Sequence, residues 1–271
     1  MKKILLEVEG LTQRFGGIIA NNNISFKVYQ NSITALIGPN GAGKTTVFNC
    51  VTGFYHASAG NIYLYDDNGQ KQHTIAKLLT RPFTGGSHLV ARAGIARTFQ
   101  NIRLFQDMTV LENLLVAQHL QLDGNLFRGM LASSRFEQQE QDGVDRAMQW
   151  LERLHLSADA NVLAGSLPYG RQRRLEIARA MCTNPRLICL DEPAAGLNPA
   201  ETEQLAELIY ALRDEYQVTV LLIEHDMSLV MDISEHVIVL DHGEVIADGS
   251  PDEVRQDPHV IAAYLGTEII T

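Results

Sequence analysis

The chain has 271 residues, with 22 lysine and arginine side chains against 32 aspartates and glutamates, a formal net charge of −10. This length suits one α/β domain that carries an inserted subdomain. The acidic balance argues against non-specific binding to nucleic acid, because nucleic acid is itself an anion. No apolar run approaches the ~20 residues that span a bilayer. The three cysteines lack metal-ligand or paired spacing, which predicts reduced core thiols.

The first part of the chain predicts strands around a glycine-rich loop. Residues 4–10 and 23–29 have strand patterns, and in the second Ile24, Phe26 and Val28 alternate with polar residues. Residues 32–38 predict a short buried strand, which leads through the glycine-rich loop into an apolar helical segment. Residues 61–67 predict a further strand.

The middle of the chain, residues 99–167, has little strand signal and predicts an inserted helical subdomain. Residues 110–120 and 143–156 have helical patterns. The polar residues 133–143 between them predict a loop. The α/β core then consists of two parts, residues 1–98 and 168–271.

The core resumes with a compact strand at 186–191 and a helix whose start signals are clear. Asn198 is a candidate N-cap, Pro199 occupies the first helical position, and Glu201 completes a capping box. Residues 218–225 predict a strand. Residues 236–249 predict a hairpin, and the tail from residue 251 predicts helix.

The glycine-rich loop fits the phosphate-loop pattern G-x-x-x-x-G-K-[ST] and lies between a predicted strand and a predicted helix. Backbone N–H groups of such a loop surround phosphate oxygens, Lys44 reaches the β- and γ-phosphates, and the Thr45 hydroxyl binds Mg²⁺. The predicted nucleotide-binding residues here are Gly38, Pro39, Asn40, Gly41, Ala42, Gly43, Lys44, Thr45 and Thr46.

Other candidate site residues follow the predicted strands. Asp191 and Glu192 end one strand, where Asp191 is expected to hold Mg²⁺ directly or through water and Glu192 to polarise the attacking water. His225 ends the next strand and is expected to contact the γ-phosphate. For two residues the sequence pattern alone leaves two alternatives. Gln100 either binds Mg²⁺ or water or has no role in the site. Phe15 either stacks on adenine or packs in the core.

The order of these motifs resembles that of the ATP-binding cassette (ABC) nucleotide-binding domains over nearly the whole chain. The resemblance implies a P-loop NTPase α/β core of ABC type, with an N-terminal antiparallel β subdomain and an inserted α-helical subdomain. It implies ATP and Mg²⁺ as cofactors. It also implies that Phe15 stacks on adenine, that Gln100 is the Q-loop glutamine, that Asn198 belongs to the D-loop, and that His225 is the switch histidine.

The stretch 166–181, SLPYGRQRRLEIARAM, holds the signature loop by this resemblance. In this family two cassettes pack head to tail, so that Gly170 and Arg171 would face the nucleotide of the other cassette. The sequence departs from the family pattern, because Pro168 replaces a serine, Tyr169 a glycine, and Arg171 a glutamine. Asn198 likewise stands where aspartate is usual.

Within the family, the chain looks most similar to the ATP-binding subunits of bacterial branched-chain amino-acid importers. The residues that carry this likeness are 16–17, 169–170, 173–179, 191–199, 224–227 and 263–266. The expected partners are a second cassette, identical or not, two integral membrane permease subunits and a periplasmic binding protein. The expected location is the cytoplasmic face of the inner membrane. Urea or short-amide import, lipopolysaccharide export and a soluble cassette ATPase are the alternatives.

Overall fold

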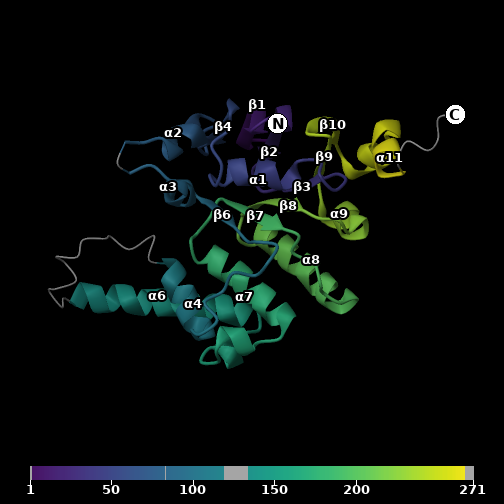
Figure 1. Ribbon diagram of the computed structural model, residues 1–271. Coiled ribbons are helices and arrows are strands. Elements are labelled where there is room, and N and C mark those ends of the chain that lie inside the picture. The colour runs from purple at the N-terminus through teal and green to yellow at the C-terminus, as the bar shows by residue number, and fades with distance from the viewer. Residues whose placement is uncertain (1, 83, 119–133, 266–271) are drawn as a thin grey trace. The chain divides into compact units, whose positions relative to one another are not determined.

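A computed structural model describes residues 2–82, 84–118 and 134–265 of the chain. Its contacts divide into two compact units (Figure 1). The core unit comprises residues 1–100 and 186–271, and the helical unit comprises residues 101–185. Sequence analysis ended the inserted subdomain at residue 167, eighteen residues earlier than the helical unit. The difference arises because helix α7 (Tyr169–Met181) packs against the helices before it in the chain.

An antiparallel sheet forms the N-terminal part of the core unit, with strand order β2-β1-β4-β5. Its strands are β1 (Ile4–Phe15), β2 (Ile18–Tyr29), β4 (Ala59–Tyr65) and β5 (Lys71–Thr74). In β2 the side chains of Ile24, Phe26 and Val28 are buried while the residues between them are exposed, as the alternation predicted. Both β1 and β2 are longer than predicted, because they continue to the two-residue Gly16-Gly17 turn.

The second sheet has six strands in the order β10-β9-β3-β8-β7-β6, of which only the edge strand β10 runs antiparallel to its neighbour. The strands are β3 (Ile33–Ile37), β6 (Ile95–Arg97), β7 (Leu187–Asp191), β8 (Thr219–Ile223), β9 (His236–Asp241) and β10 (Glu244–Gly249). Every residue of β3, β7 and β8 is buried. Because these three strands are parallel, the residues that follow them meet at one edge of the sheet.

Helices flank the strands of the core unit. They are α1 (Lys44–Val51), α2 (Ile75–Leu79), α3 (Ser87–Arg92), α8 (Pro199–Asp214), α9 (Met227–Ile233), α10 (Pro251–Gln256) and α11 (Pro258–Leu265). The capping box at the start of α8 is confirmed, since the Asn198 side chain accepts from the Glu201 backbone and Glu201 accepts from the Asn198 backbone. The mixed α/β fold predicted from the sequence is therefore confirmed.

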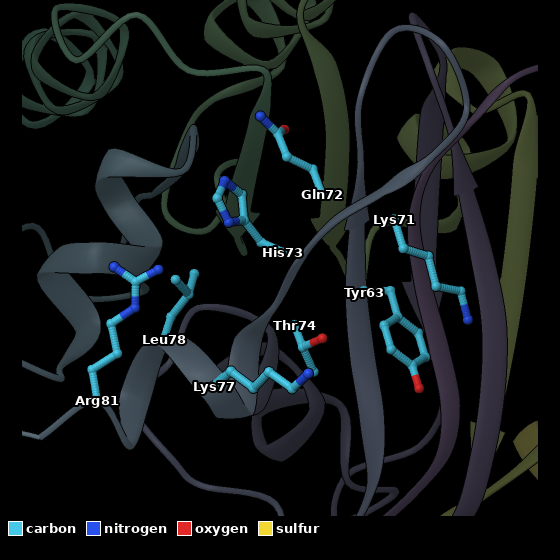
Figure 2. Close-up of a pocket in the computed structure, with 8 residues that line it drawn as sticks. All are labelled: Tyr63, Lys71, Gln72, His73, Thr74, Lys77, Leu78 and Arg81. Carbon is cyan, nitrogen blue, oxygen red and sulfur yellow. The ribbon is translucent and has the colours of Figure 1, made fainter.

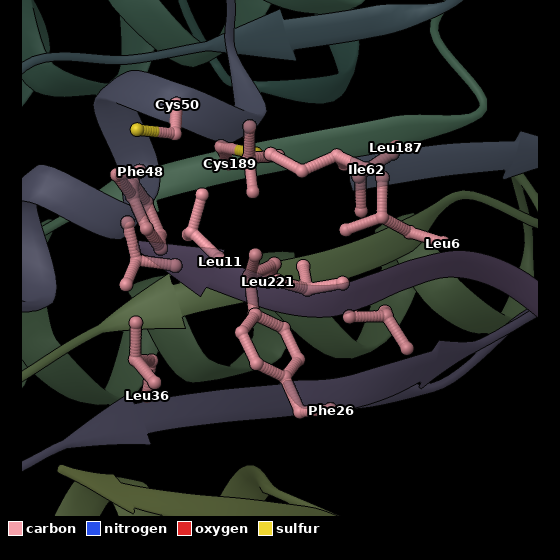
Figure 3. Packing of buried hydrophobic residues seen from close by; sticks show 14 of the residues in the cluster. Leu6, Leu11, Phe26, Leu36, Phe48, Cys50, Ile62, Leu187, Cys189 and Leu221 are labelled. Carbon is pink, nitrogen blue, oxygen red and sulfur yellow. The ribbon is translucent and has the colours of Figure 1, made fainter. Parts of the chain in front are cut away.

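The main hydrophobic core joins both sheets and α1 (Figure 3). Leu6 and Phe26 come from the antiparallel sheet, Phe48 from α1, and Leu221 from the parallel strands. Cys50, Cys182 and Cys189 are buried free thiols, and burial raises the pKa of each to about 12. These cysteines are therefore protonated at neutral pH and pack as core residues, as predicted.

The helical unit consists of α4 (Val110–Gln118), α6 (Ser134–Arg153), α7 and two short 3₁₀ turns, η1 (Ser157–Asp159) and η2 (Ala164–Ser166). Both predicted helices are present, although residues 119 and 120 of the first lie outside the described residues, as does Gly266 of the importer likeness. In α6 the side chains of Ala147 and Leu151 are buried, as is Leu154, which directly follows the helix. None of the helices in the described part of the chain has the length and apolar character needed to cross a membrane.

One element was predicted wrongly. The polar residues 133–143 were expected to form a loop, but α6 begins at Ser134 and includes residues 134–143, while residue 133 lies outside the described residues. Glutamate, glutamine and arginine are good helix formers, and they need no buried face to extend a helix that packs elsewhere. Hydrogen bonds one turn apart support this part of α6, from Gln138 to Asp142 and from Gln141 to Asp145.

Candidate active site

The glycine-rich loop connects β3 to α1, and two glycines fix its path. Gly38 has a φ of 146°, and a Cβ atom at this position would lie 2.0 Å from the carbonyl oxygen of Leu240 in β9. Gly43 has a φ of 98°, and a Cβ there would lie 2.3 Å from the Asn21 side chain. Only glycine fits both positions, because larger residues are excluded by contact and by backbone conformation. The loop is thus held closely against β2 and β9.

Lys44 begins α1, and its side chain turns back over the loop. Its Nζ donates to the carbonyl oxygens of Gly38, at 2.7 Å, and Pro39, at 2.9 Å. Burial lowers the pKa of Lys44, while the negative charge of Glu192 acts in the opposite direction. A buried cation beside the N-terminus of a helix, within a loop of backbone amides, is an arrangement that favours a phosphate group.

Two of the predicted residues, Gln100 and His225, meet at the carboxylate of a third, Glu192. The two oxygens of Glu192 have different partners: Gln100 Nε2 donates to Oε2 at 2.8 Å, and His225 Nε2 lies 2.9 Å from Oε1. Glu192 follows β7, Gln100 follows β6 by three residues, and His225 follows β8 by two. This convergence results from the parallel order β8-β7-β6, which brings the carboxyl ends of these strands side by side.

The backbone holds Glu192 in an unusual conformation. Its φ is 47°, in the left-handed region that non-glycine residues rarely occupy. The Glu192 amide donates to the Ile223 carbonyl at 2.9 Å, which ties the residue to the end of β8. Such a conformation is stabilised by its surroundings, and it points the carboxylate toward Gln100 and His225 rather than along the strand.

Glu224 is a buried residue of this site that sequence analysis missed. Its Oε1 accepts from the Ala194 amide at 2.6 Å and its Oε2 from the His225 amide at 3.0 Å. Burial raises the pKa of Glu224, although these backbone hydrogen bonds act against the increase. Glu224 therefore connects the segment after Glu192 to the segment that carries His225. The sequence signal that could have identified Glu224 is its position as an acidic residue directly after the apolar strand β8.

Arg97 is a second missed residue, and it contacts Asp191. Its guanidinium donates to Asp191 Oδ2 at 2.7 Å, and the side chains are only 7% and 5% exposed. The same guanidinium donates to Asn49 Oδ1 at 2.6 Å and to Thr52 Oγ1 at 3.2 Å, both in or next to α1. Arg97 thus joins α1 to β7 three residues before Gln100.

We predict that Arg97→Met destabilises the protein by about 3–5 kcal/mol, the usual effect of removing one partner of a buried ion pair. The Asp191 carboxylate would keep its buried position without a cation beside it. Urea unfolding measures the change. Arg186→Met is the matched control, because the ion pair of Arg186 with Asp67 is exposed and is worth about 1 kcal/mol or less. Equal effects of the two substitutions would contradict a structural role for the Arg97 pair.

Phe15, at the end of β1, is 43% exposed, so the alternative that it is a core aromatic is wrong. Its ring contacts that of Tyr55 in an edge-to-face arrangement, with 5.2 Å between centroids. Tyr55 follows α1 and is also partly exposed, at 38%. Together they present an aromatic surface that a flat base could contact.

The signature residues lie in the helical unit, at the start of α7. Pro168 is the N-cap, and its carbonyl accepts from the amides of Arg171 and Gln172. The Arg171 guanidinium donates to Asp159 at 2.9 Å and is 46% exposed. Tyr169, which replaces the family's glycine, has a hydrogen-bond partner within α7. Buried Arg173 donates to the Tyr169 hydroxyl at 3.0 Å and to Glu176 at 3.0 Å.

A basic hollow in the core unit contains none of the predicted site residues. Figure 2 shows its lining, in which Lys77, Arg81 and His73 extend from β5 and from α2 and the residues after it. Burial lowers the pKa of His73, and the charges of Arg81 and Arg186 lower it further. His73 is therefore neutral at pH 7, and this hollow is a separate feature from the glycine-rich loop.

A strand, a phosphate loop and a helix, with acids and a histidine after the neighbouring parallel strands, define a nucleotide hydrolase of the P-loop class. The profile described as ABC transporter matches residues 21–195, and one described as branched-chain amino acid ATP-binding cassette transporter matches residues 244–269. The chain belongs to the ABC transporter family and is one of its ATP-binding, ATP-hydrolysing subunits. The family resemblance found in the sequence is confirmed.

Curated relatives match over nearly their full length. The high-affinity branched-chain amino acid transport ATP-binding protein BraF of Pseudomonas aeruginosa is 51% identical over 266 residues, covering 98% of this chain and 99% of BraF. LivG of Escherichia coli K12, which has the same description, is 52% identical with the same coverage. Among solved structures, a nucleotide-free ATP-binding cassette from an ABC transporter is 31% identical with a TM-score of 0.79. The ADP conformation of the cassette MJ1267 is 30% identical with a TM-score of 0.78, and for both structures the match covers 97% of this chain and 99% of the other.

Proposed function

We propose that ATP hydrolysis by this subunit drives the import of branched-chain amino acids. Branched-chain amino acids as the cargo are supported by the names of relatives that are 51% and 52% identical in sequence. The match of residues 244–269 to the branched-chain amino acid cassette family supports the same cargo. One observation supports the assignment of these residues to ATP hydrolysis: Gln100 and His225 both contact the carboxylate of Glu192. The negative charge of this carboxylate also acts on the Lys44 ammonium group.

In this proposal the residues divide the work at the nucleotide. Glu192 accepts the proton of the attacking water, and His225 and Gln100 orient its carboxylate and contact the γ-phosphate side of the site. Lys44 exchanges its two loop carbonyls for phosphate oxygens. The backbone N–H groups of the loop, which Pro39 lacks, surround the phosphates, and Phe15 with Tyr55 contacts the adenine.

Mg²⁺ fits the donors that the site offers. Thr45, Gln100 and Asp191 supply oxygen atoms, which are the ligands that Mg²⁺ prefers together with phosphates and waters. Because Asp191 is buried and already paired with Arg97, we favour the water-mediated alternative for this carboxylate. When bound, Mg²⁺ would neutralise charge on the phosphates.

We further propose that a second cassette completes the site, head to tail, with Gly170, Arg171 and Asn198 facing its nucleotide. The amides at the start of α7 precede the first intrahelical hydrogen bonds and are available to an anion. Arg171 is half exposed and bonded to Asp159, so it can turn to a phosphate only by giving up that partner. Asn198 caps α8 through its side-chain oxygen Oδ1. In this proposal its side-chain amide group faces the other cassette.

The proposed membrane partners are two permease subunits, with a periplasmic binding protein on the far side. The subunit would then lie on the cytoplasmic face of the inner membrane. An exposed apolar group in the helical unit supports docking to such a partner: Phe105 is 48% exposed, Met108 37% and Leu163 51%. Hydrogen bonds tie these segments together, from the Ala164 amide to Met108 O and from the Gly165 amide to Gln106 O.

The proposed cargo and docking surface are tested together in vesicles that contain the complete transporter. We expect ATP-driven uptake of labelled leucine and no uptake of labelled urea. The double substitution Phe105→Asp and Met108→Asp should lower leucine uptake at least tenfold while basal ATPase of the isolated subunit stays within twofold of wild type. The reason is that charged side chains cannot be buried against an apolar partner surface without a large desolvation cost.

A matched control is Phe105→Leu, which changes the same exposed side chain but keeps this position apolar. Uptake should be unchanged in this variant. Normal uptake in the double variant would locate the docking surface elsewhere, and urea uptake would overturn the proposed cargo.

A further inference from the structure

An apolar groove of about 510 Å³ lies in the C-terminal part of the core unit. It is bordered by α9, α10 and α11, and α10 packs against both other helices. Figure 1 labels α9 and α11. Its volume falls within the roughly 300–1,000 Å³ usual for ligand pockets. The apolar side chains that line it are Ile37, Met227, Met231, Val260, Ile261 and Tyr264.

The groove contains one charge. Arg255, near the end of α10, is part of the lining, and the only other polar lining residue is Ser228. Among the residues that the structure describes, no carboxylate lies within ion-pair distance of Arg255. A guanidinium that borders an apolar surface suits a ligand with an aliphatic body and a carboxylate at one end. The lining offers no acid that would hold an ammonium group.

The groove also touches two parts of the hydrolytic machinery. Ile37 is the last residue of β3 and directly precedes Gly38 of the phosphate loop, while Met227 follows His225 by two residues. Tyr264 of α11 also lines the groove and is 42% exposed. Gly243, before β10, donates to the Ala42 carbonyl at 3.1 Å.

We propose that this groove binds a small aliphatic carboxylate without a charged amine, such as a branched 2-oxo acid, and that its occupation weakens nucleotide binding. A ligand between α9 and α11 would pack against Ile37 and so restrain the adjoining Gly38. It would thereby stabilise the loop conformation in which Lys44 bonds to the carbonyls of Gly38 and Pro39. Because a ligand shifts a protein toward the conformation that it binds better, nucleotide binding then becomes less favourable. The inference rests on the proposed nucleotide site but not on the proposed cargo.

Calorimetric titration of the full chain with 4-methyl-2-oxopentanoate tests the site directly. We expect saturable binding, with leucine and 3-methylbutylamine each binding at least tenfold more weakly, since one adds an unmatched ammonium group and the other lacks the carboxylate. Arg255→Gln should weaken binding of the oxo acid tenfold or more, the usual effect of losing a charged hydrogen bond. Arg92→Gln, at an exposed arginine of α3 outside the groove, is the control and should bind as wild type does.

The link to the nucleotide is measured in the same instrument. A saturating concentration of the oxo acid should lower ADP affinity about fivefold or more, and saturating ADP must lower affinity for the acid by the same factor. Basal ATPase should be equal in wild type and Arg255→Gln, so a failure of the nucleotide site would appear separately. Absence of saturable binding, equal binding by Arg255→Gln, tighter binding of leucine, or an unchanged ADP affinity would each overturn the proposal.

Discussion

Replacing Glu192 by glutamine should slow ATP hydrolysis by about a hundredfold or more, the usual scale for loss of a general base. Glutamine preserves the size of the side chain but cannot accept the proton of the attacking water. One of its two terminal atoms becomes a donor, so the contact with Gln100 Nε2 or that with His225 Nε2 loses its acceptor. The phosphate loop and Lys44 are unchanged, and ATP should still bind.

The measurement pairs steady-state ATPase with size-exclusion chromatography in the presence of ATP. A variant that binds but does not hydrolyse ATP should accumulate as a closed dimer if a second cassette completes the site. Glu201→Gln is a suitable control, because the side-chain hydrogen bonds of this glutamate, in the part of the chain that the structure describes, are those of the α8 capping box, which glutamine can also form. Turnover within tenfold of wild type in Glu192→Gln would remove Glu192 from the role of base.

Several features of the core unit could be predicted because they are local. The buried strands β3, β7 and β8 are short apolar runs, and site residues come directly after them: the glycine-rich loop after β3, Glu192 after β7, and Glu224 and His225 after β8. Parallel order then brings Glu192 and His225 to one edge without further information. The length of α6 could not be predicted in this way, since its first turns are polar and depend on the packing of its later turns.

The missed residues act through long-range contacts. Arg97 lies in a segment with no charge pattern of its own, and its partner Asp191 is 94 residues away in the sequence. Arg173 likewise has an ordinary place in a basic helix, yet it is 1% exposed and bonds to Tyr169. The end of the helical unit depends on the same kind of contact, because α7, which begins with the signature residues, packs with α4 and α6.

Replacing Lys44 by methionine should abolish measurable ATP hydrolysis and weaken ATP binding tenfold or more. Loss of a charged hydrogen bond costs about 1.5–3 kcal/mol, and each 1.4 kcal/mol corresponds to a factor of ten. Methionine keeps the buried aliphatic stem of a side chain that is only 6% exposed, so the fold should persist.

In the structure the same ammonium group bonds to Gly38 O and Pro39 O, so the substitution also frees two loop carbonyls. It removes a buried cation at the same time, and these effects on stability oppose each other. We therefore expect the urea midpoint to change little, and Lys77→Met, at an exposed lysine, supplies the baseline. ATP affinity from calorimetry and turnover are then compared at equal folded fraction. A folded Lys44→Met protein that hydrolyses ATP at a near-normal rate would mean that this lysine closes the loop but does not bind the phosphates.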